Sequence, residues 1–235
     1  MNATEKWKPP QRRRVYLVRH GEVSYFEQAG KPARPDLVPL NESGRHQALM
    51  TAPTLAAIPW DRVITSGLRR TEETAQLLLA GRSAPMERHE CLQEIRPGKL
   101  GTQEPAEIEA AMRASFGFQL NSEATFLGGE TYHDFLNRVV PWWRGFLADP
   151  TWNQVLIVAH GGVNRAILGH VLGLGLTCFG LLEQDPCCVN LIEVEPSGQC
   201  WLRLVNATIH DPNKMTFRLT TMERLYQEFL GEDPR

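Results

Sequence analysis

The sequence predicts an α/β fold, a three-layer α/β/α sandwich around a mostly parallel central sheet. Apolar runs of strand length alternate along the chain with segments of helical periodicity, which is the pattern of a parallel sheet covered by helices. The run 155–159, Val-Leu-Ile-Val-Ala, is continuously apolar, as expected for a central strand buried on both faces. Further on, the turn-forming residues 195–198 join two strand-like runs and indicate a hairpin.

The predicted elements follow from these patterns and from capping residues. Strands are expected at residues 14–19, 62–65, 154–159, 189–194 and 201–205. Helices are expected at residues 42–57, 68–79, 105–115, 131–147, 162–172 and 221–230. Side chains suited to cap the first, second and fourth of these helices are those of Asn41, Ser66 and Thr131. Gly81 and Gly173 mark two helix ends, and Pro141 should kink the helix that contains it.

The composition excludes several classes of protein. The 235 residues are 42% hydrophobic and 22% charged with a net charge of −2, which is ordinary for a globular protein and gives no basic field to attract nucleic acid or membranes. The five cysteines have no regular spacing, so we expect reduced thiols and a cytoplasmic protein. No stretch is apolar enough for a membrane span. We expect a flexible lead-in at residues 1–13 and a single domain at residues 14–235.

The segment with the clearest chemistry is Arg19-His20-Gly21-Glu22, directly after the first apolar strand. An arginine and a histidine at a strand end are costly to bury unless they bind something. In α/β sheets, ligands bind at the carboxyl ends of the strands. The tetrad therefore predicts an anion site, with Glu22 more typical of a scaffold residue than of a ligand contact.

Two further segments repeat this logic. His160-Gly161-Gly162 also follows an apolar strand, so its histidine and His20 can converge at one edge of a parallel sheet. The segment 66–71, Ser-Gly-Leu-Arg-Arg-Thr, follows a short strand and opens a helix, whose N-terminus favours anions. An arginine in that first turn, Arg70, adds donors suited to phosphate oxygens, whereas Arg69 is expected to be solvated.

Taken in order, these segments resemble the histidine phosphatase superfamily, also called the phosphoglycerate mutase-like family. The resemblance covers Val15 to about Val205. It rests on the tetrad at 19–22, on Ser66-x-Leu68-x-Arg70-Thr71-x-x-Thr74-Ala75, on Leu92-x-Glu94-Ile95-x-x-Gly98 and on His160-Gly161-Gly162-Val163, with Gly129-Glu130-Thr131 and Arg138-Val139 as a further helix opening.

The resemblance implies a mechanism and a phosphoglycerate mutase-like fold. His20 would be the nucleophile that becomes phosphohistidine, and Glu94 the general acid and then base. Arg19, Arg70 and His160 would hold the phosphoryl oxygens. Gly161 and Ser24 are further candidates for phosphate contacts, although loop polarity also accounts for the serine. No cofactor is expected, and no cluster of residues with metal-ligand spacing is apparent.

Activity and substrate leave alternatives open. The segment after Glu94 lacks the long basic insertion of a phosphoglycerate mutase, so we expect a phosphatase acting on a small phosphorylated metabolite. A mutase and a non-catalytic phosphate-binding regulatory module remain the alternatives. Loops 24–40 and 96–130 should set the selectivity, whether through a second anion site (Arg34, Arg96, Lys99, Arg113) or through an apolar wall (Phe116, Phe118, Leu120, Phe126, Leu127). Monomer and dimer are equally consistent with the sequence.

Overall fold

The computed structural model describes residues 10–26, 33–98, 105–115, 117, 120–215 and 218–232. Its six-stranded sheet has the order β3-β2-β4-β1-β5-β6. The strands are β1 (Arg13–Arg19), β2 (Arg62–Thr65), β3 (Met86–Arg88), β4 (Gln154–Ala159), β5 (Val189–Val194) and β6 (Cys200–Ala207). The four strands from β3 to β1 are parallel to one another. The strand β5 runs antiparallel to both of its neighbours, β1 and β6. The predicted hairpin is the β5–β6 pair.

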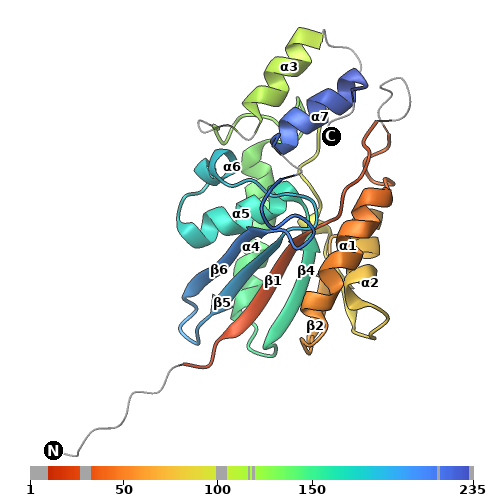
Figure 1. The fold of residues 1–235 in the computed structure, drawn as a ribbon. Coiled ribbons are helices and arrows are strands. Elements are labelled where there is room, and N and C mark those ends of the chain that lie inside the picture. Colours follow the sequence, from red (N-terminus) through yellow and green to blue (C-terminus); the bar gives the residue numbers. More distant parts are fainter. Residues whose placement is uncertain are drawn as a thin grey trace, which may run out of the picture.

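Helices cover both faces of this sheet. They are α1 (Glu42–Leu55), α2 (Arg69–Leu79), α3 (Pro105–Ala114), α4 (Tyr132–Ala148), α5 (Gly161–Leu172), α6 (Thr177–Leu181) and α7 (Thr221–Leu230), with a 3-10 turn, η2, at Glu90–Leu92. The helices α1 and α2 lie on one side of the strands and α4 and α5 on the other, whereas α3 and α7 lie together beyond the end of β1 (Figure 1). The predicted three-layer α/β sandwich is confirmed.

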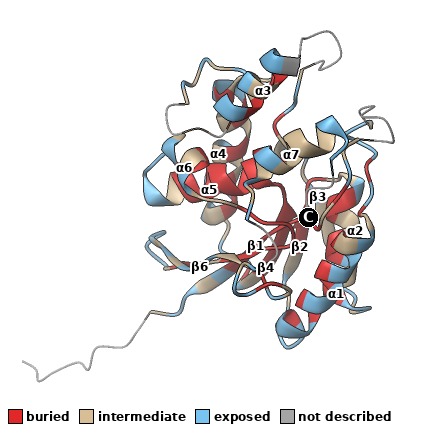
Figure 2. Cartoon of the chain, turned by 45° about the horizontal axis from the view of Figure 1, so that its top comes forward, coloured by how far each residue is buried: buried red, intermediate tan, exposed pale blue. Residues whose placement is uncertain are grey.

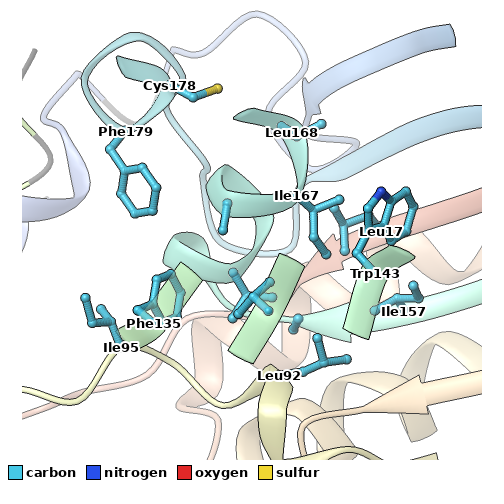
Figure 3. Packing of buried hydrophobic residues seen from close by; sticks show 14 of the residues in the cluster. Leu17, Leu92, Ile95, Phe135, Trp143, Ile157, Ile167, Leu168, Cys178 and Phe179 are labelled. Carbon is cyan, nitrogen blue, oxygen red and sulfur yellow. The ribbon is translucent and has the colours of Figure 1, made fainter. Parts of the chain in front are cut away.

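Alternation along the strands divides the core into two parts. Leu17 of β1 and Ile157 of β4 pack with α4 and α5, where Trp143, Phe135 and Ile167 are fully buried (Figure 3). Their neighbours in the strands, such as Tyr16, Val18, Leu156 and Val158, pack instead against α1 and α2. Since successive strand residues point to opposite faces, each continuous apolar run supplies both layers.

Most helix termini lie where the sequence places them. Asn41 accepts the Gly44 N–H at 2.8 Å and caps α1, and Thr131 accepts the Asp134 N–H at 3.0 Å and caps α4. The prediction that Ser66 caps α2 is wrong, because α2 begins after Leu68 and has no side-chain cap. Gly173, with φ +70°, ends α5 as predicted.

Short elements escaped the sequence analysis. The edge strand β3 has only three residues, two of them charged, and α6 has five residues, so neither carries a readable period. Burial is greatest in the strands β1, β4 and β5 and in α5, while α3 and α7 keep exposed outer faces (Figure 2). No helix among the described residues is long and apolar enough to cross a membrane.

Candidate active site

The two strand-end histidines meet in the centre of the molecule. The parallel pairing of β1 with β4 sets Arg19 opposite Ala159, so the next residue of each strand, His20 and His160, leaves the sheet at the same edge. Their ring centroids are 5.1 Å apart, and both side chains are buried. The register of two parallel strands thus brings together residues that are 140 positions apart in sequence.

His20 is held as a neutral ring with one nitrogen directed to the site. Its Nδ1 lies 2.7 Å from the Gly21 carbonyl oxygen, which can only accept, so Nδ1 carries the proton and Nε2 keeps its lone pair. Burial, with help from the charges of Arg70 and Arg19, holds the pKa of His20 well below its ordinary value. The imidazole is therefore neutral near pH 7, as a nucleophile must be.

His160 is oriented by a hydroxyl rather than by a carbonyl. Its Nε2 lies 2.8 Å from the Oγ of Ser66, the residue expected to cap α2. Gly67, at φ +79°, turns the chain between Ser66 and α2, which separates this hydroxyl from the helix end and leaves it beside the ring. Among the described residues the buried Nδ1 of His160 has no hydrogen-bond partner. Burial first, and then the charge of Arg70, keeps the pKa of His160 well below normal.

Two guanidinium groups are fixed at the site by carbonyl oxygens. Arg19 donates from Nη1 to Gln184 O at 2.5 Å and to the Thr221 hydroxyl at 3.2 Å, and Arg70 donates to Pro35 O at 2.5 Å. Both side chains are buried, and within the described chain their Nε atoms lack a partner. Buried donors without an acceptor are costly, which is the pattern of a site that receives an anion.

The neighbouring arginine differs, as expected. Arg69 donates to Glu73, four residues along α2, at 2.7 Å, and its side chain is 60% exposed. Arg70 is 2% exposed. One residue of helical rotation therefore separates a solvated charge from one directed into the site.

Glu94 lies at the N-terminus of α5. Its Oε2 accepts the Gly162 N–H at 3.0 Å and its Oε1 accepts the Ile95 N–H at 3.0 Å. Ile95 is buried beside Phe135, which anchors the backbone at this point (Figure 3). A β carbon at position 162 would lie 2.4 Å from Oε1, so only glycine permits this placement of the carboxylate.

A cavity of about 930 Å³ opens from these side chains toward solvent. Arg19, His20, Arg70 and Glu94 line it, and so does Ser24. Ser24 is exposed, and its hydroxyl is 3.5 Å from Asn41 Nδ2, so its phosphate contact stays a prediction.

Gly161 and Glu22 flank the site in different ways. A β carbon on Gly161 would lie 3.1 Å from Arg165 Nη1 and 3.6 Å from Arg19 Nε, so the glycine gives the two arginines room beside the first turn of α5. Glu22 accepts from Arg224 at 3.0 Å and from Asn41 at 3.0 Å, which supports the scaffold role expected for it.

The sequence analysis missed the contribution of α7. Thr221 contacts Arg19 and also donates to Glu183, which forms an ion pair with the buried Arg165 at 2.9 Å. The signal was present as a capping box from Thr220 to Glu223 at the start of an amphipathic segment. Nothing in the local pattern, however, indicates that this helix lies against a strand end about 200 residues earlier in the sequence.

The selectivity residues expected from the loops are only partly described. Phe126 and Leu127 line the cavity, and so does Arg96, whereas Arg34 pairs with Asp36 and Arg113 with Glu109. Leu120 packs against the core instead. Lys99, Phe116 and Phe118 lie outside the described residues. The described chain contains no group of three or more His, Cys, Asp or Glu residues placed to hold a metal ion.

A buried pair of neutral imidazoles, two fixed guanidinium groups and a carboxylate at a helix N-terminus form an arrangement that is chemically suited to a phosphoryl group. Comparison with known proteins agrees. Residues 15–208 match the model of the histidine phosphatase superfamily (branch 1). The chain belongs to this superfamily, which confirms the class that the sequence motifs indicated.

Individual relatives show how far the likeness extends. A probable 2-carboxy-D-arabinitol-1-phosphatase of Arabidopsis thaliana is 28% identical over 207 residues, which are 85% of this chain but 43% of that protein. The chain thus spans less than half of the plant relative. A probable phosphoglycerate mutase of Salmonella paratyphi A is 25% identical, covering 80% of this chain and 87% of that protein. The crystal structure of a putative alpha-ribazole-5'-P phosphatase from Escherichia coli K-12 has a TM-score of 0.68 at 25% identity, covering 83% and 96% of the two chains.

Proposed function

We propose that this protein is a metal-independent phosphomonoester hydrolase that acts through a phosphohistidine on His20. The observation that carries the proposal is the set of buried nitrogens left without partners in the described chain, His160 Nδ1 and the Nε atoms of Arg19 and Arg70, around the neutral ring of His20. A bound phosphoryl group would satisfy these donors, and the two guanidinium groups would supply its counter-charge.

The reaction has two steps at one phosphorus atom. In the first, His20 Nε2 attacks phosphorus while the bond to the ester oxygen breaks, and protonated Glu94 gives its proton to the leaving alcohol. In the second, Glu94 takes a proton from water, whose oxygen attacks phosphorus and breaks the P–N bond. Inorganic phosphate leaves, and both His20 and protonated Glu94 are regenerated.

The remaining residues stabilise charge and fix orientation. Arg19, Arg70 and His160 would contact the phosphoryl oxygens, whose charge is spread in the transition state. Ser66 orients His160, because its hydroxyl bonds to Nε2 and leaves Nδ1 toward the site. The Gly21 carbonyl orients His20 by accepting from Nδ1, which leaves Nε2 toward the site.

The nature of the acceptor separates two activities of the same site. A mutase returns the phosphoryl group to an alcohol, and one relative is named as a probable phosphoglycerate mutase. Transfer to water is favoured here by the cavity of about 930 Å³, which opens from His20 toward solvent. We place the enzyme in the cytoplasm, because its five cysteines form no disulfide. Its substrate would be a small phosphorylated metabolite.

Hydrolysis of p-nitrophenyl phosphate with a chelator present tests the proposal. Wild-type protein should release p-nitrophenol, and His20→Ala should lose activity by at least about a thousandfold. The matched control is His133→Ala, an exposed histidine on α4 that is bonded to Asn137 and does not line the cavity. Protein denatured in alkali during turnover, where the P–N bond is stable, should carry phosphate on His20. Equal activity of wild type and His20→Ala would overturn the proposal, and phosphoryl exchange between phosphoglycerates without net hydrolysis would identify a mutase.

A further inference from the structure

The cavity extends well beyond the phosphoryl site, and its outer part is a distinct surface. Its volume of about 930 Å³ is in the range of pockets that enclose a whole drug-sized ligand. The proposed catalytic residues are few among its lining residues. The rest is bounded by the loop after β1, by the 120–130 segment and by α7. These outer walls would contact the alcohol portion of a substrate, since Glu94, which would protonate that alcohol, borders the same cavity.

The outer walls carry many apolar groups. The main contributors are Tyr25, Phe26, Phe126, Leu127, Met222 and Leu225. Phe126, Leu127 and Met222 are buried in the protein, so they present fixed surfaces rather than flexible side chains. Apolar ligand atoms placed against these groups would leave water, which stabilises binding by up to about 0.8 kcal/mol for each methylene buried.

The charges of the outer walls would disfavour a second anion. Apart from Glu94, the described lining residues include five carboxylates, those of Glu22, Asp36, Glu42, Glu228 and Glu232. Against these stand two guanidinium groups outside the phosphoryl site, those of Arg96 and Arg224. Arg224 is already paired with Glu22 at 3.0 Å. Asp36 is also paired, with Arg34 at 2.8 Å, so among the described lining residues Glu42, Glu228 and Glu232 stand against Arg96, and this excess of negative charge disfavours an anionic alcohol.

The helix α7 is fixed in place as the wall of this cavity. Thr221 accepts from Arg19 at 3.2 Å, Arg224 donates to Glu22 at 3.0 Å, and Glu228 accepts the Tyr25 N–H at 2.7 Å. These contacts occur on successive turns of one helix, and they join it to the last residue of β1 and to the segment that follows this strand. The wall is therefore positioned before substrate binds, which lowers the entropic cost of recognition.

From these observations we propose that the outer cavity selects phosphate monoesters whose leaving alcohol is extended, apolar and free of negative charge, with α7 as the selecting wall. This inference rests on the proposed hydrolase function, because it assigns the substrate class of that same site. It adds a third selectivity segment, residues 221–232, to the two loops expected from the sequence.

A series of n-alkyl phosphates, from ethyl to octyl, tests the apolar wall directly. In the wild-type enzyme kcat/KM should rise with chain length by up to about fourfold for each methylene. Leu225→Ala should flatten this rise. The matched control is Leu230→Ala, on the same helix but 47% exposed and outside the cavity lining, and it should keep the wild-type dependence. A flat dependence in the wild type, which needs no variant to be measured, would overturn the inference.

Comparison of n-hexyl phosphate with 5-carboxypentyl phosphate tests the charge. The carboxylate should lower kcat/KM by at least about tenfold, and the difference should shrink at high salt because repulsion between partly exposed charges is screened. Equal or faster turnover of the carboxylate ester would overturn the inference. These results are separable from the proposed function, since His20-dependent hydrolysis of p-nitrophenyl phosphate can hold while the selectivity fails.

Discussion

Substitution Gly162→Ala tests the placement of Glu94 as the proposed general acid. A β carbon at this position would lie 2.4 Å from Glu94 Oε1, whereas an ordinary contact is at least 3.4 Å, so the carboxylate must move by at least 1.0 Å. A misplacement of about 1 Å costs roughly a hundredfold in rate, or about 2.7 kcal/mol in the barrier. We therefore expect kcat/KM for an alkyl phosphate to fall about a hundredfold.

The same substitution should leave stability almost unchanged. Alanine in place of glycine favours a helix by up to about 1 kcal/mol. The hydrogen bond from the Gly162 N–H to Glu94, at 3.0 Å, is disturbed at a cost of about 1 kcal/mol. Because these effects oppose each other, the midpoint of thermal unfolding should stay within a few degrees of wild type.

The assay compares two leaving groups. p-Nitrophenol leaves with little need for a proton, so Gly162→Ala should slow its release far less than that of an alkyl alcohol. Glu94→Gln should show the same preference. Gly145→Ala is the matched control, because a β carbon there, in the last turn of α4, meets nothing within 4 Å, and both rates should be unchanged. Equal losses on both substrates in Gly162→Ala would refute the acid role of Glu94.

Three further predictions concern the other contacts. Ser66→Ala removes the hydroxyl that orients His160 and should lower kcat about tenfold. Ser66→Thr keeps a hydroxyl and should retain most of the wild-type kcat. An unchanged kcat in the alanine variant would contradict this role. Thr221→Val removes one anchor of Arg19 and should weaken inhibition by inorganic phosphate about fivefold, and an unaltered inhibition constant would count against the contact. The pKa values of His20 and His160 are held below normal, so the unfolded chain takes up two protons that the folded chain does not. Stability is thus complete above about pH 6.5 and falls below it, by up to about 2.7 kcal/mol per pH unit from this pair. Urea unfolding in phosphate-free buffer at pH 6 and 5 should show a shallower loss in the His20→Gln, His160→Gln double variant than in wild type, and equal slopes would refute the assignment.

Local patterns predicted the long elements because each carries its own signal. The apolar run of β4 and the capped amphipathic helix α4 were placed within a residue of their observed ends. The edge strand β3 and the helix α6 are too short to show a period, and their conformation depends on neighbours. The pairing order β3-β2-β4-β1-β5-β6 likewise follows from contacts between segments distant in sequence.

The candidate site divides in the same way. Arg19, His20 and His160 were named in advance, because a charged or imidazole side chain after a buried strand has few structural explanations. Arg70 was named from its place in the first turn of a helix, and Glu94 from the resemblance to the superfamily. They could not show that a hydroxyl expected to cap a helix would orient a ring instead. The contact of Ser66 with His160 depends on where the residues after β2 and after β4 meet, and the local sequence of neither segment specifies that position.

Periodicity, capping and strand-end chemistry are local properties, so the fold class, the order of the principal elements and the candidate phosphate-binding groups could be predicted from the sequence. The orientation of these groups and their surroundings depend on the tertiary structure. The tautomer of His20 depends on the Gly21 carbonyl, the position of Glu94 depends on the missing side chain of Gly162, and the outer wall of the cavity is α7. Glu94 and Gly162 lie 68 positions apart, and α7 contacts the end of β1 from about 200 residues away, so packing brings these groups together. The contact of His20 with Gly21 depends instead on how the backbone turns after β1.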